Sequence, residues 1–210
     1  MEEMICVKNV SKKFGQQTVL SHISLSMEAG KIYGLVGYNG SGKTVLMKCI
    51  CGLLLADEGD IHVKGEKIGE QMIKNAGVII EEPAFLKNES GKKNLQLLYM
   101  LNHKKDNVKI ERVMKKVGLD AGNRKKVRHY SLGMRQRLAI AQAVMEDPEI
   151  LILDEPMNGL DKQGVGEIRE LLLSYKEEGK VILLASHNRE DIQILCDEVY
   201  EIEEGRLERI

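Results

Sequence analysis

The 210-residue sequence contains no tryptophan, only two phenylalanines and only four cysteines. Two of the cysteines, Cys49 and Cys51, are two positions apart on a predicted helix, so their side chains point to different faces. This spacing disfavours a disulfide or a metal site, and we expect all four thiols to be buried and reduced in a cytosolic protein. The five histidines are scattered along the chain, which argues against a histidine-based metal cluster.

A charge excess and long apolar runs are also absent. The formal net charge is −1, which provides no basic field for nucleic acid or anionic lipid. No apolar run is long enough to span a membrane. The acidic start, residues 1–3, lacks the basic segment of a signal peptide, so we expect the chain to stay in the cytosol. The length fits one domain with a good core and room for an inserted subdomain.

The most informative stretch is segment 37–44, which reads Gly-Tyr-Asn-Gly-Ser-Gly-Lys-Thr. Segment 31–36 before it is predicted to be a buried strand, and segment 45–51 after it is predicted to be a helix that ends at Gly52. Strand, glycine loop, Lys-Thr and helix together are the arrangement of a phosphate-binding loop. A glycine-rich turn with an accidental lysine is the alternative, and the flanking elements argue against it.

The residue types of this loop explain its chemistry. Glycines let successive backbone N–H groups approach a phosphate without a Cβ clash, and the following helix directs the positive end of its dipole at the same anion. We expect Lys43 to reach the β- and γ-phosphates of a nucleotide. We expect the Thr44 hydroxyl to bind Mg²⁺.

The remaining pattern predicts an α/β fold with a P-loop NTPase core, in which helices flank a mixed, mainly parallel sheet. Residues 4–10 and 23–27 alternate in polarity and predict an antiparallel β-subdomain at the N-terminal end. A turn at 57–60 and a strand at 61–65 are predicted next. Further strands are predicted at 76–80, 150–153, 181–185, 199–202 and 207–210, the last two as a hairpin.

Residues 84–146 differ in character from the rest of the chain, because glycines become fewer, lysines accumulate and helical spacing dominates. We therefore predict a single domain in which 1–83 and 147–210 form the core and 84–146 form an inserted helical subdomain. The basic run 124–129 is interpreted as a solvated surface, with a nucleic-acid patch as the alternative. Two apolar stripes support the helices, one of Leu95, Leu98, Met100 and Leu101, the other of Ile110, Val113, Met114 and Val117.

Acidic residues follow two of the predicted strands. Glu81 and Glu82 come after the strand at 76–80, and Asp154 and Glu155 end the next apolar one. Ligands bind at the carboxyl ends of strands in open α/β sheets, so these carboxylates are placed to reach a metal ion or a water. We expect Asp154 to hold Mg²⁺ and Glu155 to orient or deprotonate the attacking water. A solvated loop is the alternative for the first pair, and capping of the next element for the second.

Four further residues are candidates for ligand contact. Phe14 lies ahead of the glycine loop and is placed either to stack on an adenine base or to plug the core. Ser131 and Gly133 begin a predicted helix, whose start is receptive to an anion, with a plain N-cap as the alternative. His187 follows the strand at 181–185 and is placed to hydrogen-bond a γ-phosphate, with a surface cap as the alternative.

The ordered set of motifs resembles the ATP-binding subunit of an ABC transporter over essentially the whole chain. Asp154 matches the family's metal-anchoring aspartate and Glu155 its catalytic glutamate. Phe14 matches the base-stacking aromatic, Asp161 the aspartate that acts across a dimer, and His187 the switch histidine. The resemblance implies that three residues are catalytic, namely Lys43, Glu155 and His187. It assigns nucleotide contacts to the loop residues Gly37, Tyr38, Asn39, Gly40, Ser41, Gly42, Lys43 and Thr44, and to Ser131, Gly133, Met134 and Arg135 of a signature motif.

The sequence departs from the usual family pattern at a few positions. Leu132 and Met134 stand where the commonest signature motif has glycines. Glu81 stands where the family usually has glutamine; it can still bind Mg²⁺ or its water, but it adds a negative charge near the triphosphate. The register also allows Glu82 to occupy this position. The patterns Ile-Glu-Glu-Pro and Tyr-Ser-Leu-Gly-Met are similar to the branch that serves peptide-antibiotic export and self-immunity, of the bacitracin- and lantibiotic-resistance type.

The resemblance implies an ATP- and Mg²⁺-dependent ATPase that energises a membrane transporter, with export of a peptide antibiotic or similar compound as its expected task. Two identical chains would pair head to tail around ATP, and hydrolysis would open the pair. A separately encoded membrane-spanning permease would convert this motion into transport and hold the chain at the inner face of the cell membrane. The alternative is a soluble ABC-type ATPase that acts on nucleic acid or ribosomes. A second ATPase core and a strongly basic surface are missing, so we expect no nucleic-acid partner.

Overall fold

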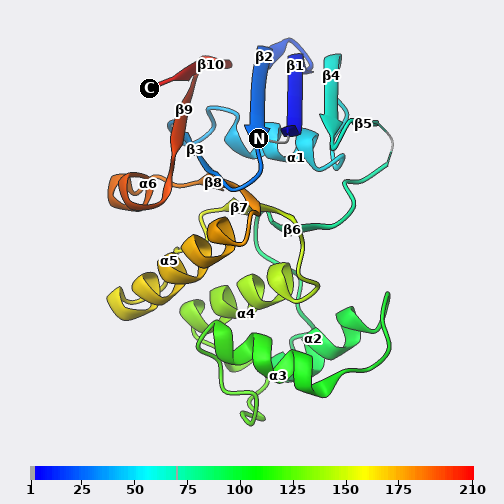
Figure 1. Cartoon of the computed structure of the whole chain (residues 1–210), viewed down its shortest axis with the longest axis vertical. Helices are drawn as coiled ribbons and strands as arrows, with labels where there is room; N and C mark the ends of the chain where they lie inside the picture. Colours follow the sequence, from blue (N-terminus) through cyan, green and yellow to red (C-terminus); the bar gives the residue numbers. More distant parts are fainter. Residues whose placement is uncertain (1–2, 70) are drawn as a thin grey trace.

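Two β-sheets and the helices around them make up the computed structural model, which describes residues 3–69 and 71–210 (Figure 1). The antiparallel sheet has the order β2-β1-β4-β5, with β1 (Glu3–Phe14), β2 (Gln17–Glu28), β4 (Glu58–Val63) and β5 (Glu66–Ile68). The second sheet has the order β10-β9-β3-β8-β7-β6 and is parallel except for the β9-β10 hairpin. Its strands are β3 (Ile32–Val36), β6 (Ala76–Ile79), β7 (Ile150–Asp154), β8 (Val181–Ala185), β9 (Glu198–Glu203) and β10 (Arg206–Arg209). The predicted α/β class is confirmed.

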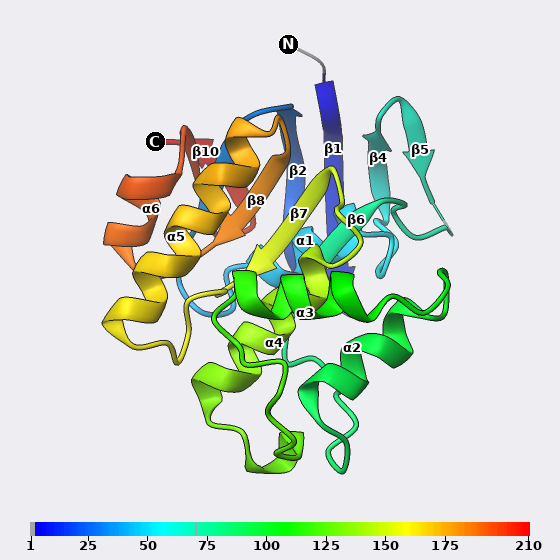
Figure 2. The same ribbon diagram turned by 60° about the horizontal axis from the view of Figure 1, so that its bottom comes forward.

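The helices pack on the second sheet and below it (Figures 1 and 2). Helix α1 directly follows the loop after β3, while α2, α3 and α4 gather at the end of the molecule away from the antiparallel sheet. We call residues 84–146, which contain these three helices, the helical lobe; its status as a separate subdomain stays a prediction. The helices are α1 (Lys43–Ile50), α2 (Gly91–Tyr99), α3 (Asn107–Lys116), the 3₁₀ helix η1 (Val127–His129), α4 (Leu132–Val144), α5 (Lys162–Glu177) and α6 (Arg189–Leu195).

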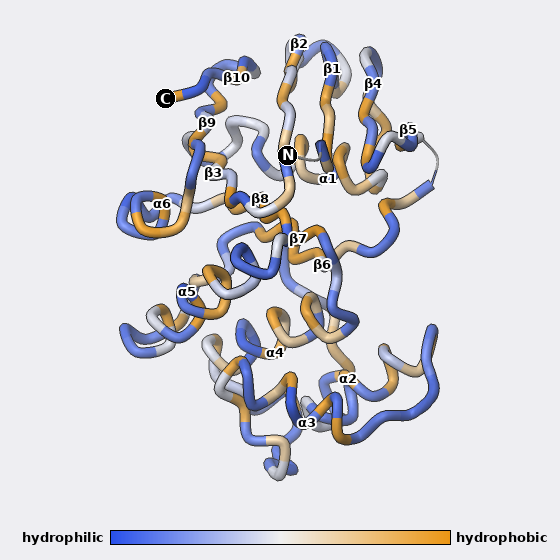
Figure 3. Tube along the Cα trace, viewed as in Figure 1, coloured by the Kyte–Doolittle hydropathy of each residue, from blue (hydrophilic) through white to orange (hydrophobic). Residues whose placement is uncertain are grey.

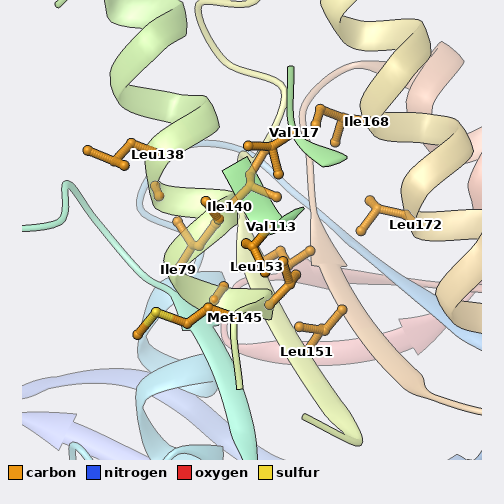
Figure 4. Packing of buried hydrophobic residues seen from close by; sticks show 14 of the residues in the cluster. Ile79, Val113, Val117, Leu138, Ile140, Met145, Leu151, Leu153, Ile168 and Leu172 are labelled. Carbon is orange, nitrogen blue, oxygen red and sulfur yellow. The ribbon is translucent and has the colours of Figure 1, made fainter. Parts of the chain in front are cut away.

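The parallel sheet separates two apolar clusters, because successive side chains on a strand point to opposite faces. On β7, Ile150 and Ile152 join the cluster around α1 and the antiparallel sheet, whereas Leu151 and Leu153 join the cluster under α4 and α5 (Figure 4). Burying each such side chain stabilises the fold by about 2 kcal/mol. Hydropathy along the trace is highest in these central strands and lowest at the outer turns (Figure 3).

The backbone of the helical lobe closely approaches the edge strand of the sheet. Gly77 in β6 faces the end of α4, where a Cβ would lie 2.0 Å from the carbonyl oxygen of Ala143. Only a residue without a side chain fits this approach. The end of α4 is therefore held against the edge strand of the sheet.

One helical stripe in the lobe is confirmed and the other is partly wrong. Ile110, Val113, Met114 and Val117 are all buried, as their spacing predicts. The predicted stripe of α2 continues too far, because α2 ends at Tyr99, and Met100 and Leu101 lie beyond it with exposed fractions of 48% and 77%. The helix stops at Tyr99, and the backbone N–H of His103 donates to the Tyr99 carbonyl oxygen at 3.0 Å in the turn that follows.

The predicted turn at 57–60 is also wrong, since β4 begins at Glu58. Pairing with β1 draws these residues into the sheet, and Gly59, at φ 84°, lets the strand pass close to the backbone carbonyls of Lys8 and Asn9. Helix α6 and strand β5 had no prediction. Strand β2 begins at Gln17 rather than at residue 23.

The four cysteines are free, and three of them, Cys6, Cys49 and Cys51, are buried, while Cys196 is half-buried. The expectation of unbridged thiols is confirmed. Among the described residues, no helix combines the length and apolar character that crossing a bilayer requires.

Candidate active site

The loop between β3 and α1 adopts backbone conformations that require glycine. Gly37, Gly40 and Gly42 have φ values of 142°, 87° and 113°, in the region that side chains disfavour. A Cβ on Gly37 would also lie 2.5 Å from the carbonyl oxygen of Ile202. The glycines therefore allow the chain to turn tightly at the carboxyl end of β3, directly before the N-terminus of α1.

Lys43 folds back over this loop. Its Nζ donates hydrogen bonds to the carbonyl oxygens of Gly37 at 2.7 Å and Tyr38 at 3.1 Å, and the residue is 8% exposed. An ammonium group held at the centre of a loop of backbone amides is placed to attract an anion.

The Ser41 hydroxyl lies in the same loop and tests whether a phosphate fits there. Its Oγ is buried and has no hydrogen-bond partner. A buried hydroxyl without a partner is rare, because the lost hydrogen bond costs about 1–3 kcal/mol. A phosphate oxygen is an acceptor of the kind that this hydroxyl lacks, so the loop fits the group.

Thr44 and Asp154 meet at the carboxyl end of the parallel sheet. The Thr44 Oγ1 donates to Oδ2 of Asp154 at 2.7 Å, although the two residues are 110 positions apart. Oxygen ligands of this kind suit Mg²⁺, which usually takes one or two protein ligands and completes its shell with waters and substrate phosphates. In residues 3–69 and 71–210 there is no cluster of three or more His, Cys, Asp or Glu side chains that could hold a metal alone. The donor set therefore fits a magnesium ion shared with a phosphate.

Glu155 and His187 form a second pair beside the first. The Nδ1 of His187 lies 2.9 Å from Oε2 of Glu155, and the backbone N–H of His187 donates to Oε1 at 3.0 Å. Glu155 has a positive φ of 49°, and its own N–H donates to the carbonyl oxygen of Ala185 at 2.9 Å. The strained backbone directs this carboxylate across the end of β8 rather than along β7.

The side chain of Glu155, which His187 contacts from outside, lines a cleft of about 420 Å³ together with Lys43, Thr44 and Asp154. Glu81 and Glu82 both line it, so the geometry leaves open which of them has the role of the usual glutamine. Glu81, at φ 62°, is mostly exposed and pairs with Lys48 on α1. No sequence pattern predicted this ion pair. Gln136 and Asn158 also line the cleft and were not predicted.

Phe14 ends β1 and is 50% exposed, with the Nζ of Lys12 5.6 Å from the centre of its ring. The alternative that Phe14 plugs the core is wrong. Tyr38 in the glycine loop is likewise 58% exposed. The stacking of an adenine on Phe14 stays a prediction.

The residues of the predicted signature motif lie at the start of α4. The Ser131 Oγ accepts the Met134 N–H at 3.1 Å and caps the helix, while Arg135 donates to the Tyr130 carbonyl oxygen at 2.8 Å. Gly133 packs so closely on Gly159 that a Cβ would lie 2.8 Å from its carbonyl oxygen.

Asp161 has a similar capping role at α5, where its Oδ1 accepts the Gly164 N–H at 3.0 Å. The lining of the cleft includes Leu132, but neither Ser131 nor Asp161. Within one chain these two residues are helix caps that lie outside the lining of the cleft.

A phosphate-binding loop at the end of a parallel strand, with Thr-Asp and Glu-His pairs on the neighbouring strands, defines a P-loop NTPase. The model of the ABC transporter family matches residues 20–158. The chain belongs to this family, and it is an ATP-binding, ATP-hydrolysing component of an ABC transporter.

Similar proteins cover almost the whole chain. An uncharacterised ABC transporter ATP-binding protein, YybJ of Bacillus subtilis, is 44% identical over 98% of this chain and 95% of its own length. The bacitracin transport ATP-binding protein BcrA of Enterococcus faecalis is 41% identical over 99% of this chain and 68% of its own length. The lantibiotic transport ATP-binding protein SrtF of Streptococcus pyogenes is 36% identical over 97% and 89%.

Solved structures share the fold. An ATP-binding subunit of an ABC transporter superposes with a TM-score of 0.86 at 25% identity, covering 99% of this chain and 90% of that one. A dimeric ATP-binding cassette bound to ADP and Pi superposes with a TM-score of 0.88 at 22% identity, covering 98% and 97%. The predicted family is confirmed, and the transport names favour this function over the nucleic-acid alternative.

Proposed function

We propose that ATP binds with its β- and γ-phosphates in the loop 37–44 and that Lys43 and the Ser41 hydroxyl turn to the phosphate oxygens. The Thr44–Asp154 pair would hold Mg²⁺, which neutralises phosphate charge when it is bound. The observation that carries this proposal is the 2.7 Å contact between Thr44 and Asp154 in the lining of the cleft, which Glu155 shares. His187 contacts Glu155 at 2.9 Å from outside that lining.

Hydrolysis then follows from the two side chains on β7 and β8. Glu155 orients a water and accepts its proton while the water oxygen attacks the γ-phosphorus. The bond between the γ-phosphorus and the bridging oxygen breaks, which leaves ADP and phosphate. His187 keeps the Glu155 carboxylate in position through two contacts and presents its Nε2 toward the γ-phosphate.

We propose that two copies of the chain pair head to tail. The helix start at Ser131 and the turn before Asp161 would then close over the nucleotide of the partner. The support is that both residues lie outside the lining of the cleft in one chain, although the resemblance assigns them to nucleotide contacts.

The permease is proposed to dock in a second cleft, of about 600 Å³, between the edge strand β6 and the ends of α2 and α4. Exposed or half-buried apolar side chains line it, among them Met72, Leu98 and Leu101. The continuing segment after β6 carries Glu81 and Glu82 into the catalytic cleft, so one short stretch connects the two clefts. Docking here would hold the chain at the inner face of the membrane.

The transported compound is proposed to be a peptide antibiotic. This rests on the names of BcrA and SrtF, which are bacitracin and lantibiotic transport proteins. Expression with its permease should raise the resistance of a sensitive host to such a peptide, and expression with the Asp154→Asn variant should not.

The catalytic site is tested by the ATPase rate as a function of magnesium concentration. Thr44→Ala and Asp154→Asn should both raise the magnesium concentration that gives the half-maximal rate, because each removes one oxygen ligand. Asp120→Asn, at an exposed position of the helical lobe outside the lining of the cleft, is the matched control and should leave this value unchanged. Equal magnesium dependence in all four proteins would contradict the proposed metal site.

A further inference from the structure

The net charge of −1 conceals a strong separation of charge. The helical lobe, residues 84–146, contains 15 Lys and Arg against 5 Asp and Glu, a net charge of +10, and the remaining residues carry 16 against 27, a net charge of −11. The expectation that no basic field exists is therefore wrong for this part of the molecule. Such an asymmetry indicates that the lobe faces an anionic partner.

One loop of the lobe adds exposed apolar side chains to this charge. Met100, Leu101 and Val108 are 48%, 77% and 66% exposed, and Lys104 and Lys105 between them are exposed as well. Neither lysine has a carboxylate partner among the ion pairs of the described residues. We call residues 100–108 the apolar-basic loop.

The loop has a fixed shape. The backbone N–H groups of Met100, Leu101 and His103 donate to carbonyl oxygens of α2, and the His103 ring stacks on Tyr99 with their centres 4.4 Å apart. Asp106, the one acid in the loop, uses its Oδ1 to cap α3 by accepting the Lys109 N–H at 2.9 Å. The apolar side chains therefore stay exposed although the backbone around them is hydrogen-bonded.

We propose that the apolar-basic loop binds an anionic lipid surface, with the lysines at the headgroup phosphates and Leu101 and Met100 at the boundary of the acyl chains. Aliphatic side chains flanked by lysines are the composition of membrane-interface segments. A nucleic acid would match the charge but not the aliphatic side chains, since single strands bind on aromatic ones. The acidic core is repelled by the same surface, so the chain adsorbs with its lobe toward the lipid.

The position of the loop agrees with the proposed permease. Leu101 and Asn102 also line the 600 Å³ cleft next to β6. A permease segment in this cleft would bring the loop to the lipids that surround the permease. The inference relies on the proposed function only for this cellular setting, because pure lipid vesicles test it without ATP or permease.

Co-sedimentation of the full chain with vesicles is the experiment. The protein should bind vesicles rich in phosphatidylglycerol and not vesicles of phosphatidylcholine, and high salt should weaken the binding. Lys104→Gln/Lys105→Gln should weaken it about twentyfold, since each lysine near an anionic surface contributes about fivefold. Met100→Ser should weaken it about tenfold, by removing an apolar side chain from the interface.

The matched control is Lys125→Gln/Lys126→Gln, which makes the same charge change on exposed positions of the same lobe. The vesicle binding of this variant should fall by less than about fivefold, because its two lysines lie outside the apolar-basic loop. Equal losses in the two double variants, absent binding to phosphatidylglycerol, or retention of RNA in place of vesicles would each overturn the proposal. The ATPase rate of every variant should equal that of the unmodified chain, so loss of vesicle binding and loss of catalysis are separate results.

Discussion

His187 contacts the Glu155 carboxylate twice, through Nδ1 at 2.9 Å and through its backbone N–H at 3.0 Å. A carboxylate only accepts hydrogen bonds, so Nδ1 carries a proton, and Nε2 can donate to a phosphate oxygen only when it carries a second one. The side chain is 72% exposed, which leaves it accessible to a phosphate. The position of Glu155 therefore depends on β8 as much as on its own strand.

Replacing Glu155 with glutamine should leave ATP affinity unchanged and lower the turnover rate by at least about a hundredfold, because the amide cannot take the proton of the attacking water. His187→Ala should lower the rate as well. The double variant should be no slower than the slower single variant, since the two side chains act as one unit. Steady-state ATPase kinetics check this, and multiplicative losses would contradict the coupling.

Lys43→Ala should weaken ATP binding by at least about thirtyfold, because a buried charge pair with the phosphates is lost. Nucleotide affinity measured by calorimetry or fluorescence checks this. Lys67→Ala, which removes an exposed lysine on β5, is the control and should bind ATP normally. Equal ATP affinities of the two variants would contradict the placement of Lys43 at the phosphates.

Glu81→Gln and Glu82→Gln, compared side by side, decide which glutamate takes the place of the family's glutamine. The functional one should change the magnesium dependence of the ATPase rate when its charge is removed, and the other should not. Glu81→Gln also breaks the ion pair with Lys48. Because this pair is exposed, its loss should change stability by less than about 1 kcal/mol. An unchanged magnesium dependence in both variants would exclude both residues.

The buried thiols should resist alkylation. Burial raises the pKa of Cys49 to about 11 and the pKa values of Cys51 and Cys196 to about 12. Below these values the reactive thiolate is scarce, so iodoacetamide at mildly alkaline pH should modify the native protein slowly and the denatured protein at all four cysteines. Mass spectrometry of the modified peptides checks this. Rapid labelling of Cys51 in the folded chain would contradict its burial.

Gly77→Ala should lower the free energy of unfolding by about 1–3 kcal/mol, because the added methyl group collides with the Ala143 carbonyl oxygen. Urea unfolding checks this. Gly166→Ala is the control, since a Cβ there meets nothing within 4 Å and the helix gains a better helix former. An unchanged free energy of unfolding in Gly77→Ala would contradict this prediction, because it would mean that α4 moves away from the sheet without cost.

Local signals explain what the sequence could predict. Neighbouring residues were enough to place two features correctly in the fold. Segment 37–44 follows a strand and leads into a helix, and Asp154 ends an apolar strand. Contacts between distant segments carry no such signal. The Lys48–Glu81 pair and the entry of Glu58 into β4 arise only when the chain has folded.

The end of α2 shows the same limit. Apolar spacing continued through Leu101, although α2 ends at Tyr99 and the His103 ring stacks on Tyr99 in the turn that follows. A helical repeat does not explain why Met100 and Leu101, which lie beyond Tyr99, are exposed. A partner surface, rather than the core, explains their apolar character.

The contact between Gly77 and the Ala143 carbonyl oxygen sets the distance between β6 and the end of α4. A larger residue at position 77 would push this end of the helix away from the sheet, and because an α-helix is rigid, the displacement would reach Ser131 at its other end. The edge strand of the sheet therefore positions the predicted signature motif.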